Sequence, residues 1–294
     1  MSILEAIIIA IVEGLTEFLP VSSTGHMIIA QSMMGVESTE FVKAFTVIIQ
    51  FGAILSVVVL YWKKFFKLNK IKIFDKDSVV GLNTSQKYWT YLKRFLHKFD
   101  FYWKLFIALL PAAVLGLLFS DIIDDLLENV FVVSVMLIIG GVVMLFVDKW
   151  FNKPINDQSI SWQRSLKIGL IQCIAMIPGV SRSFATIVGG MSTKLNRKNA
   201  AEFSFFLAVP TMAAAAGYKM FKLMKDPASM AMLKEHAITL AVGNVVAFLV
   251  AIIAIRFFID FLTKHGFKAF GWYRIIVGLI LIVLMLSGTG LNVI

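Results

Sequence analysis

Long apolar stretches, separated by shorter polar ones, make up most of the chain. Six of these stretches approach or reach the roughly 20 residues that a helix needs to cross a hydrocarbon core of about 30 Å. They are residues 41–62, 104–120, 130–148, 199–219, 237–258 and 269–287. The pattern therefore predicts an all-α polytopic membrane protein with six transmembrane helices.

Two further apolar segments, residues 1–34 and 164–193, are each interrupted by a proline within a polar cluster. The interruptions read FLPVSSTGH in the first segment and MIPGVSRSF in the second. Proline ends a helix because it lacks an amide donor and clashes with the preceding turn, and the Ser, Thr and Gly residues around it suit a turn or a new N-cap. The arm from Met27 to Gly35 is too short to cross the membrane, so we expect each segment to be a re-entrant helical hairpin.

The two halves of the chain are related in sequence. The letters VSS at residues 21–23 align with VSR at residues 180–182, and the same alignment places Glu13 over Gln172. Each half then contains one hairpin and three transmembrane helices, and an odd number of crossings gives the halves opposite orientations. We expect one membrane domain, residues 1–294, built as an inverted-topology repeat whose broken elements meet near the midplane. The repeats are residues 1–148 and 164–287.

Composition supports a membrane protein and narrows the function classes. The chain is 59% hydrophobic, contains 26 Phe and has a mean hydropathy of +0.84, which exceeds what a soluble domain carries. Its net charge of +10 comes mostly from loops beside apolar runs, where the positive-inside rule explains it, so we expect no nucleic-acid partner. Cys173 is the only cysteine, which excludes an internal disulfide.

Charge in the loops predicts how the chain is oriented. The long polar loop at residues 63–104 has eleven Lys and Arg against three Asp, so we expect it in the cytoplasm. The first hairpin, the acidic loop at residues 120–129 and the C-terminus then fall outside. The loop at residues 219–236 is also basic but is expected outside, as an exception.

Two carboxylates lie in the first interrupted segment. Glu13 and Glu17 are four residues apart, so they share one helix face and can chelate a divalent cation or divide metal binding and proton transfer between them. On a soluble helix both would lie in surface water, but in so apolar a segment ionisable groups are expensive and usually functional. His26 lies across the break, where a hairpin could return it to the carboxylates.

Hydroxyl groups follow the first break. Ser22, Ser23 and Thr24 can cap the returning helix, and the N–H groups at a helix N-terminus can bind an anionic phosphate. One hydroxyl can also act as a nucleophile if His26 or a glutamate serves as its base.

An arginine occupies the second break. Arg182 lies between Ser181 and Ser183 and aligns with Ser23 of the first hairpin. An arginine at membrane depth needs an anionic partner, either a glutamate of the first hairpin or a phosphate. The carboxylates, hydroxyls and arginine together suit hydrolysis of a phosphoanhydride that carries a lipid tail.

At these residues the sequence resembles the bacterial undecaprenyl-diphosphate phosphatases of the bacitracin-resistance type. The similarity rests on EGLTEFLPVSSTGH, VIIQFGAIL, PGVSRSFATIVGGM and AAEFSFFLAVP, which are spread over most of the chain. It implies hydrolysis of undecaprenyl diphosphate to the monophosphate and phosphate, with a divalent cation such as Mg²⁺ or Ca²⁺, in recycling of the cell-wall lipid carrier. It also implies a multi-pass protein of the bacterial cytoplasmic membrane, with membrane lipids as further partners. The charge of the loops places the expected active site on the extracytoplasmic side.

The resemblance assigns roles to the residues of both breaks. The expected catalytic residues are Glu17, Ser23, His26 and Arg182. The expected substrate-binding residues are Ser22, Thr24, Ser181, Arg182 and Ser183, and the expected metal ligands are Glu13 and Glu17. Whether Ser23 or His26 attacks is open, as is assembly into a homodimer. A lipid-phosphate transporter or flippase is the alternative function, because inverted repeats with broken helices also occur in transporters.

Overall fold

A computed structural model describes residues 1–66, 68–75, 77–127 and 129–287, and this part of the chain forms helices and connecting segments without any strand. The first half contains α1 (Ile3–Thr16), α2 (Ser23–Met34), α3 (Glu40–Leu60), α4 (Trp62–Phe66), the short 3₁₀ helix η1 (Asp77–Val79), α5 (Thr84–Lys98), α6 (Asp100–Leu118), α7 (Ser120–Leu127) and α8 (Val130–Trp150). The second half contains α9 (Trp162–Gln172), η2 (Cys173–Met176), α10 (Arg182–Ser192), α11 (Arg197–Lys225), α12 (Pro227–Glu235), α13 (Ala237–His265) and α14 (Lys268–Leu286).

Six of these helices are long and apolar enough to cross a membrane, and they coincide with the six predicted stretches. They are α3, α6, α8, α11, α13 and α14. The prediction of an all-α protein that crosses the membrane several times is therefore confirmed. Helices α11 and α13 have 29 residues each, about 44 Å of helix, so they extend beyond the predicted stretches and beyond a hydrocarbon core.

Two pairs of shorter helices are separated by breaks where the prolines were expected to end a helix. Pro20 lies in the break between α1 and α2, and Pro178 lies in the break between η2 and α10. The last residue of each break, Ser22 or Ser181, has a positive φ of 71° or 76°. Because a non-glycine residue rarely adopts this left-handed conformation, the two breaks share an unusual local backbone at matching sequence positions.

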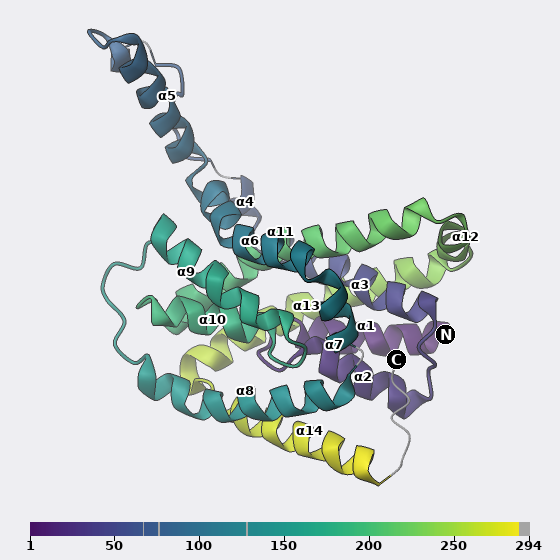
Figure 1. The fold of residues 1–294 in the computed structure, drawn as a ribbon. Coiled ribbons are helices and arrows are strands. Elements are labelled where there is room, and N and C mark those ends of the chain that lie inside the picture. The colour runs from purple at the N-terminus through teal and green to yellow at the C-terminus, as the bar shows by residue number, and fades with distance from the viewer. Residues whose placement is uncertain (67, 76, 128, 288–294) are drawn as a thin grey trace.

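The short pairs pack against the long helices in related ways. Helix α1 packs on α13 and α9 packs on α6, while α3 contacts both α13 and α11. A Cβ atom on Gly14 of α1 would clash with the backbone of α13, and one on Gly169 of α9 would clash with the backbone of α6. Helices α8 and α14 lie side by side along one edge of the molecule (Figure 1). This packing brings the two breaks together in the interior.

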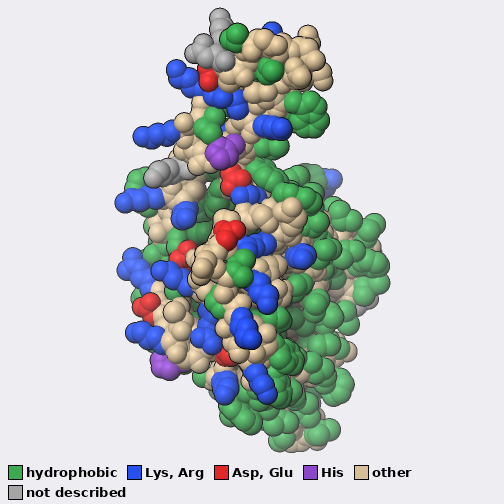
Figure 2. Space-filling view, turned by 90° about the vertical axis from the view of Figure 1, so that its left-hand side faces the viewer, with side chains coloured by type: hydrophobic (Ala, Val, Ile, Leu, Met, Phe, Trp, Pro, Cys, Tyr) green, Lys and Arg blue, Asp and Glu red, His purple; other side chains and the backbone are tan. Residues whose placement is uncertain are grey.

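One end of the helical body is rich in basic side chains. Lys and Arg side chains gather on the end that Figure 2 shows, which is the left-hand side of Figure 1. We call this end the basic face. Its exposed lysines at the ends of helices and in the adjoining loops are Lys149, Lys153, Lys167, Lys194, Lys198, Lys264 and Lys268.

The long loop that contains α5 and the second basic loop, residues 219–236, lie at different ends of the helical body (Figure 1). The long loop that contains α5 begins and ends beside α11 on the side of the basic face, because Phe65 and Phe101 both pack on Phe206. Helix α12 belongs to the basic loop at residues 219–236, which was the exception to the charge rule. It lies at the opposite end with the N-terminus, where Met1 and Met232 pack against one apolar cluster. The expected position of the last residues, 288–294, lies outside the described part of the chain.

Candidate active site

A pocket of about 170 Å³ lies where the two breaks meet. Its walls come from both breaks and from α3, η2 and α11. The polar residues that line it are Glu17, Ser22, Ser23, Thr24, Gln50, Ser181 and Arg182. The structure therefore brings together six of the nine residues predicted for the site, from segments more than 150 positions apart.

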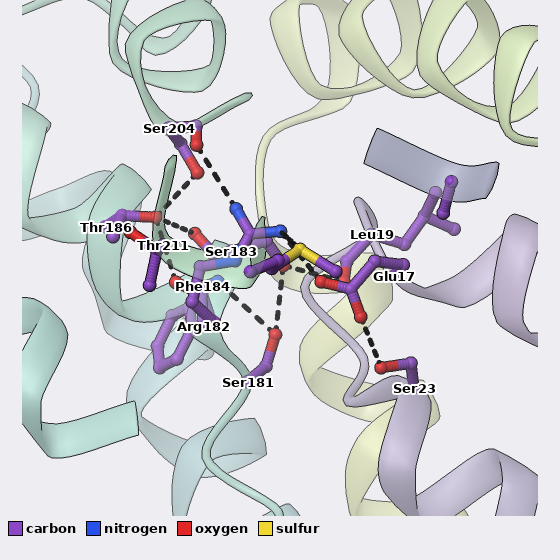
Figure 3. A network of polar contacts seen from close by, with 12 residues as sticks. Glu17, Leu19, Ser23, Ser181, Arg182, Ser183, Phe184, Thr186, Ser204 and Thr211 are labelled. Carbon is purple, nitrogen blue, oxygen red and sulfur yellow. Dashed lines mark hydrogen bonds and ion pairs between the residues drawn. The ribbon is translucent and has the colours of Figure 1, made fainter. Parts of the chain in front are cut away.

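Glu17 is the centre of the polar contacts in this pocket. It caps the C-terminus of α1, and its two carboxylate oxygens have different partners, as Figure 3 shows. Oε1 accepts a hydrogen bond from Arg182 Nη2 at 2.8 Å, and Oε2 accepts one from Ser23 Oγ at 2.6 Å. The protein partner of Arg182 is thus Glu17, which settles the choice between the two glutamates that the sequence left open.

Glu13 lies one helical turn before Glu17 and is completely buried. Neither of its carboxylate oxygens has a hydrogen-bond partner. A buried carboxylate without a partner is costly, so it needs either a proton or a cation. It provides the donor atoms that a divalent cation requires, beside the carboxylate of Glu17.

The donor set around Glu13 and Glu17 is small. In the described residues, no group of three or more His, Cys, Asp or Glu side chains is arranged to hold a metal ion. A cation held by these two carboxylates would therefore complete its shell with water and with oxygens of a bound ligand. This is the way in which Mg²⁺ commonly binds beside phosphate groups.

Arg182 is the first residue of α10, and its guanidinium has an N–H donor that no protein atom in the described residues accepts. Its Nη1 donates to the carbonyl oxygen of Ser204 at 3.2 Å, and its guanidinium lies 5.8 Å from the ring centre of Phe18. Its Nε is buried without a hydrogen-bond partner. Because Arg182 also lines the pocket, an anion there can receive N–H donors from a guanidinium that is already held in place.

The N-termini of α2 and α10 differ in their capping. In α10, the Ser181 hydroxyl accepts a hydrogen bond from the amide of Phe184, so a side chain caps the helix. In α2, the N-cap is Ser22, and no side chain caps the first turn. The first amides of α2 are therefore not occupied by a capping side chain, and together with the helix dipole they favour an anion.

Ser183 joins the two breaks. Its hydroxyl donates to the carbonyl oxygen of Leu19 at 2.8 Å and lies 3.0 Å from the Ser181 hydroxyl. It is completely buried and does not line the pocket. Ser183 therefore links the two breaks through its hydroxyl group.

Comparison with known proteins places this arrangement in a family. A family model described as bacitracin resistance protein BacA matches residues 6–280. The chain belongs to the BacA family. Similar proteins named undecaprenyl-diphosphatase include one from Porphyromonas gingivalis, 58% identical over 294 residues and the whole of both chains. Another from Flavobacterium johnsoniae is 53% identical over 287 residues, which cover 97% of this chain and 96% of that one. One from Bdellovibrio bacteriovorus is 48% identical over the whole of both chains.

In this BacA-family chain, His26 makes other contacts than the sequence suggested. Its Nδ1 lies 2.8 Å from the carbonyl oxygen of Ser22, and its Nε2 lies 2.8 Å from the hydroxyl of Tyr273. The two rings stack with their centres 5.5 Å apart. Both ring nitrogens therefore have partners other than the carboxylates, and His26 does not line the pocket. The contact with Ser22 lies within the first turn of α2, and the contact with Tyr273 joins this turn to α14.

Arg274 is a buried cation that the analysis of the breaks missed. It is 0% exposed, and its donors reach carbonyl oxygens in both breaks: Pro20 at 3.2 Å, Val180 at 2.9 Å and Gly179 at 2.5 Å. It also donates to Met136 and Leu137 of α8. Gly140 leaves room for it, because a Cβ atom there would meet the guanidinium. An arginine inside a predicted transmembrane stretch was the signal that could have identified it.

Gln50 is a second residue that the sequence analysis did not single out. It lines the pocket from α3, whereas the other polar groups come from the breaks and the helix starts that follow them. Its signal in the sequence is a single amide side chain within the apolar run VIIQFGAIL. Thr24 lines the same pocket.

Proposed function

We propose that this chain hydrolyses undecaprenyl diphosphate to undecaprenyl phosphate and inorganic phosphate. The observation that carries the proposal is the cluster of Glu17, Ser23 and Arg182 in one pocket of a multi-pass membrane protein. Similar proteins that align with the whole of the chain bear the name undecaprenyl-diphosphatase. A lipid-linked diphosphate supplies both the membrane anchor and the anion that this pocket requires.

Binding of the diphosphate uses donors from both breaks. The first-turn amides of α2 and the guanidinium of Arg182 face one pocket, so they can hold oxygens of the same phosphate. When Arg182 turns from Glu17 to the phosphate, Glu17 keeps its contact with the Ser23 hydroxyl. These donors also stabilise the charge that develops on the phosphate oxygens in the transition state.

The contact between Ser23 and Glu17 supports Ser23 as the nucleophile. Glu17 takes the proton of the Ser23 hydroxyl while Oγ attacks the terminal phosphorus, and the bridging P–O bond breaks with its electron pair on the departing undecaprenyl phosphate. Water then hydrolyses the phosphoserine and releases inorganic phosphate. His26 is the other candidate, but its two nitrogens contact Ser22 and Tyr273, which favours a role in positioning the start of α2.

A divalent cation, Mg²⁺ or Ca²⁺, is part of this proposal. Glu13 and Glu17 would hold it, and the unpartnered, buried carboxylate of Glu13 is the observation that supports the fit. When bound there, the ion would supply positive charge beside the phosphate oxygens.

We also propose that the two halves form an inverted repeat with re-entrant hairpins. Matching φ values at Ser22 and Ser181 support this arrangement. So do the matching packing of α1 on α13 and α9 on α6, and the mutual packing of α3 with α11 and α8 with α14. The basic face would lie in the cytoplasm of a bacterium. The pocket would then face the extracytoplasmic side. Helices α1 and α2, which carry most of the polar groups, would enter the cytoplasmic membrane from that side.

Phosphate release by the purified protein in detergent tests the function, because a flippase without hydrolytic activity releases none when there is no second compartment. We expect wild-type protein to release phosphate from undecaprenyl diphosphate and Ser23→Ala to lose this activity. Ser134→Ala is the matched control, since Ser134 is also buried but lies outside the pocket. Mass spectrometry of enzyme quenched in denaturant at neutral pH, where phosphoserine and phosphohistidine both survive, should find phosphate on Ser23. Phosphate on His26, with an active Ser23→Ala variant, would contradict Ser23 as nucleophile.

A further inference from the structure

A folded arm projects from the helical body on the side of the basic face (Figure 1). We define the arm as the described residues between 62 and 98, which include α4, η1 and α5. Arg94 of α5 pairs with Asp75 at 2.7 Å and donates to the carbonyl oxygen of Lys72 at 2.8 Å. Asn69 donates to the carbonyl oxygen of His97 at 2.6 Å. The chain before α5 is therefore fastened along the helix, and the arm has a structure of its own.

Helix α5 has one apolar face whose side chains are exposed in the described part of the chain, although Phe99 packs on Phe95 at its end. Tyr88, Trp89, Leu92 and Phe95 recur at the spacing that places side chains on one side of a helix. Tyr88 is 73% exposed and Trp89 is 60% exposed, and α5 has no buried residue at all. An uncovered stripe of large apolar side chains marks an interaction surface.

Positive charges flank this apolar face. At 100° per residue, Lys87 and Lys98 lie on one side of it and Lys93 lies on the other. The surrounding loop, residues 63–104, has eleven Lys and Arg against three Asp. The partner that fits this surface is therefore apolar at its centre and anionic around it.

The position of α5 relative to the membrane agrees with such a partner. Helix α5 ends at Lys98 and the transmembrane helix α6 begins at Asp100, so the C-terminal end of α5 lies at the membrane boundary. The base of the arm packs on α11 through Phe65, and Phe101 of the adjoining α6 packs on the same residue, Phe206. Figure 2 shows the arm above the Lys and Arg side chains of the basic face. The lipid head groups next to this face are thus within reach of α5.

We propose that α5 is an interfacial anchor that binds anionic phospholipids of the leaflet beside the basic face. Tyr88, Trp89, Leu92 and Phe95 enter the boundary between head groups and acyl chains, and the flanking lysines contact lipid phosphates. Tyr and Trp suit this position because their rings are apolar and their polar atoms stay hydrated. A second protein chain would satisfy the apolar face but would also need a matching acidic rim. The anchor is independent of the proposed hydrolysis, because none of its residues lines the pocket.

A fluorescent label on the full-length protein tests the anchor. In a Cys173→Ser background, a single cysteine replaces Leu92 on the apolar face or Thr90 on the opposite face, and each is labelled with an environment-sensitive dye. The labelled proteins are placed in nanodiscs of phosphatidylcholine alone or of an equal mixture with phosphatidylglycerol, each with spin-labelled quencher lipid. We expect quenching at position 92 to exceed that at position 90 by about twofold or more in the anionic discs, and by less in the neutral discs.

Removal of the charges provides the second arm of the test. The triple variant Lys87→Gln, Lys93→Gln, Lys98→Gln should lose the lipid-dependent difference, whereas its phosphate release in detergent should equal that of the wild type. Equal quenching at positions 90 and 92, or equal quenching in neutral and anionic discs, overturns the proposal. Shielding of position 92 that follows the number of protein copies per disc, and not lipid charge, also overturns it in favour of a contact between copies.

Discussion

Arg182 Nη2 lies 2.8 Å from Glu17 Oε1, although 165 positions separate the two residues in the chain. Both side chains are nearly buried, so this ion pair joins the two breaks in a medium of low polarity. Breaking such a pair by removing one partner leaves the other charge buried and uncompensated. The same arginine lines the pocket and has an unused Nε donor, so it is placed both to hold Glu17 and to bind a phosphate.

Arg182→Lys separates these two roles. A lysine ammonium can pair with Glu17 but offers a point charge to phosphate, where the guanidinium offers two parallel hydrogen bonds. We expect the variant to insert in the membrane and to lose about 10²-fold in the rate of phosphate release, as on loss of a transition-state donor. Thermal unfolding in detergent should change little.

Arg197→Lys is the control for this substitution, because Arg197 pairs with Asp148 at 2.8 Å outside the pocket. Its rate should stay near that of the wild type. A large loss of thermal stability in Arg182→Lys, with unchanged affinity for a diphosphate analogue, would show that Arg182 acts only as the structural partner of Glu17.

Glu13→Gln tests the cation site without depending on activity. The substitution removes a buried carboxylate that has no partner, so the free energy of unfolding should stay the same or rise in the absence of divalent cations. In the wild type, Mg²⁺ or Ca²⁺ should raise the midpoint of thermal unfolding, because a ligand that binds only the folded state stabilises it. Glu13→Gln should lose most of this rise.

The control for Glu13 is Glu235→Gln, which changes an exposed carboxylate on α12 and should keep the full response to the cation. An unaltered Mg²⁺ response in Glu13→Gln would remove Glu13 from the site.

Glu17→Gln should in turn lose activity by orders of magnitude, since the amide is a far weaker proton acceptor than the carboxylate that contacts Ser23.

Much of the fold follows from local sequence. Runs of apolar residues predict the six long helices, because the hydrocarbon core fixes their minimum length. Proline alone was not decisive, since Pro111 and Pro210 lie inside α6 and α11. The helix breaks occur at Pro20 and Pro178, where the neighbouring polar residues can replace lost backbone hydrogen bonds.

The candidate site was predictable in its residue types and only partly in its contacts. Alignment of the two breaks brought Ser23 and Arg182 to equivalent positions, and both line the pocket. The partner of His26 is Tyr273, 247 positions away, and such a contact depends on helix packing that local patterns do not encode. The contacts of Arg274 could not be predicted for a related reason. Its partners are backbone carbonyl groups, which every residue has, so the sequence does not show which of them it binds.

Cysteine labelling in intact cells tests the orientation. In the Cys173→Ser background, a cysteine at Asn83, just before α5, should stay unmodified by a membrane-impermeant reagent added from outside. A cysteine at Asn129, just before α8, should react. Both positions are exposed, so access to the residue itself does not limit the reaction. The reverse pattern would place the basic face outside and would contradict an extracytoplasmic site.

Arg274→Lys tests whether a buried cation positions both breaks. The arginine donates to five carbonyl groups, among them those of Pro20, Gly179 and Val180, whereas an ammonium has three donors and a shorter reach. Carbonyl groups left without partners cost about 1–3 kcal/mol each, so we expect a clear fall in the midpoint of thermal unfolding. The rate should also fall, because Pro20 and Val180 adjoin the segments that carry Ser23 and Arg182. Arg256→Lys on the exposed side of α13 is the control and should change neither quantity. The affinity of Arg274→Lys for a diphosphate analogue separates positioning of the breaks from direct binding. If Arg274 acts only through the breaks, added lipid that restores the thermal stability of the variant should also restore this affinity. Persistent loss of affinity at restored stability would mean that Arg274 itself contacts the diphosphate.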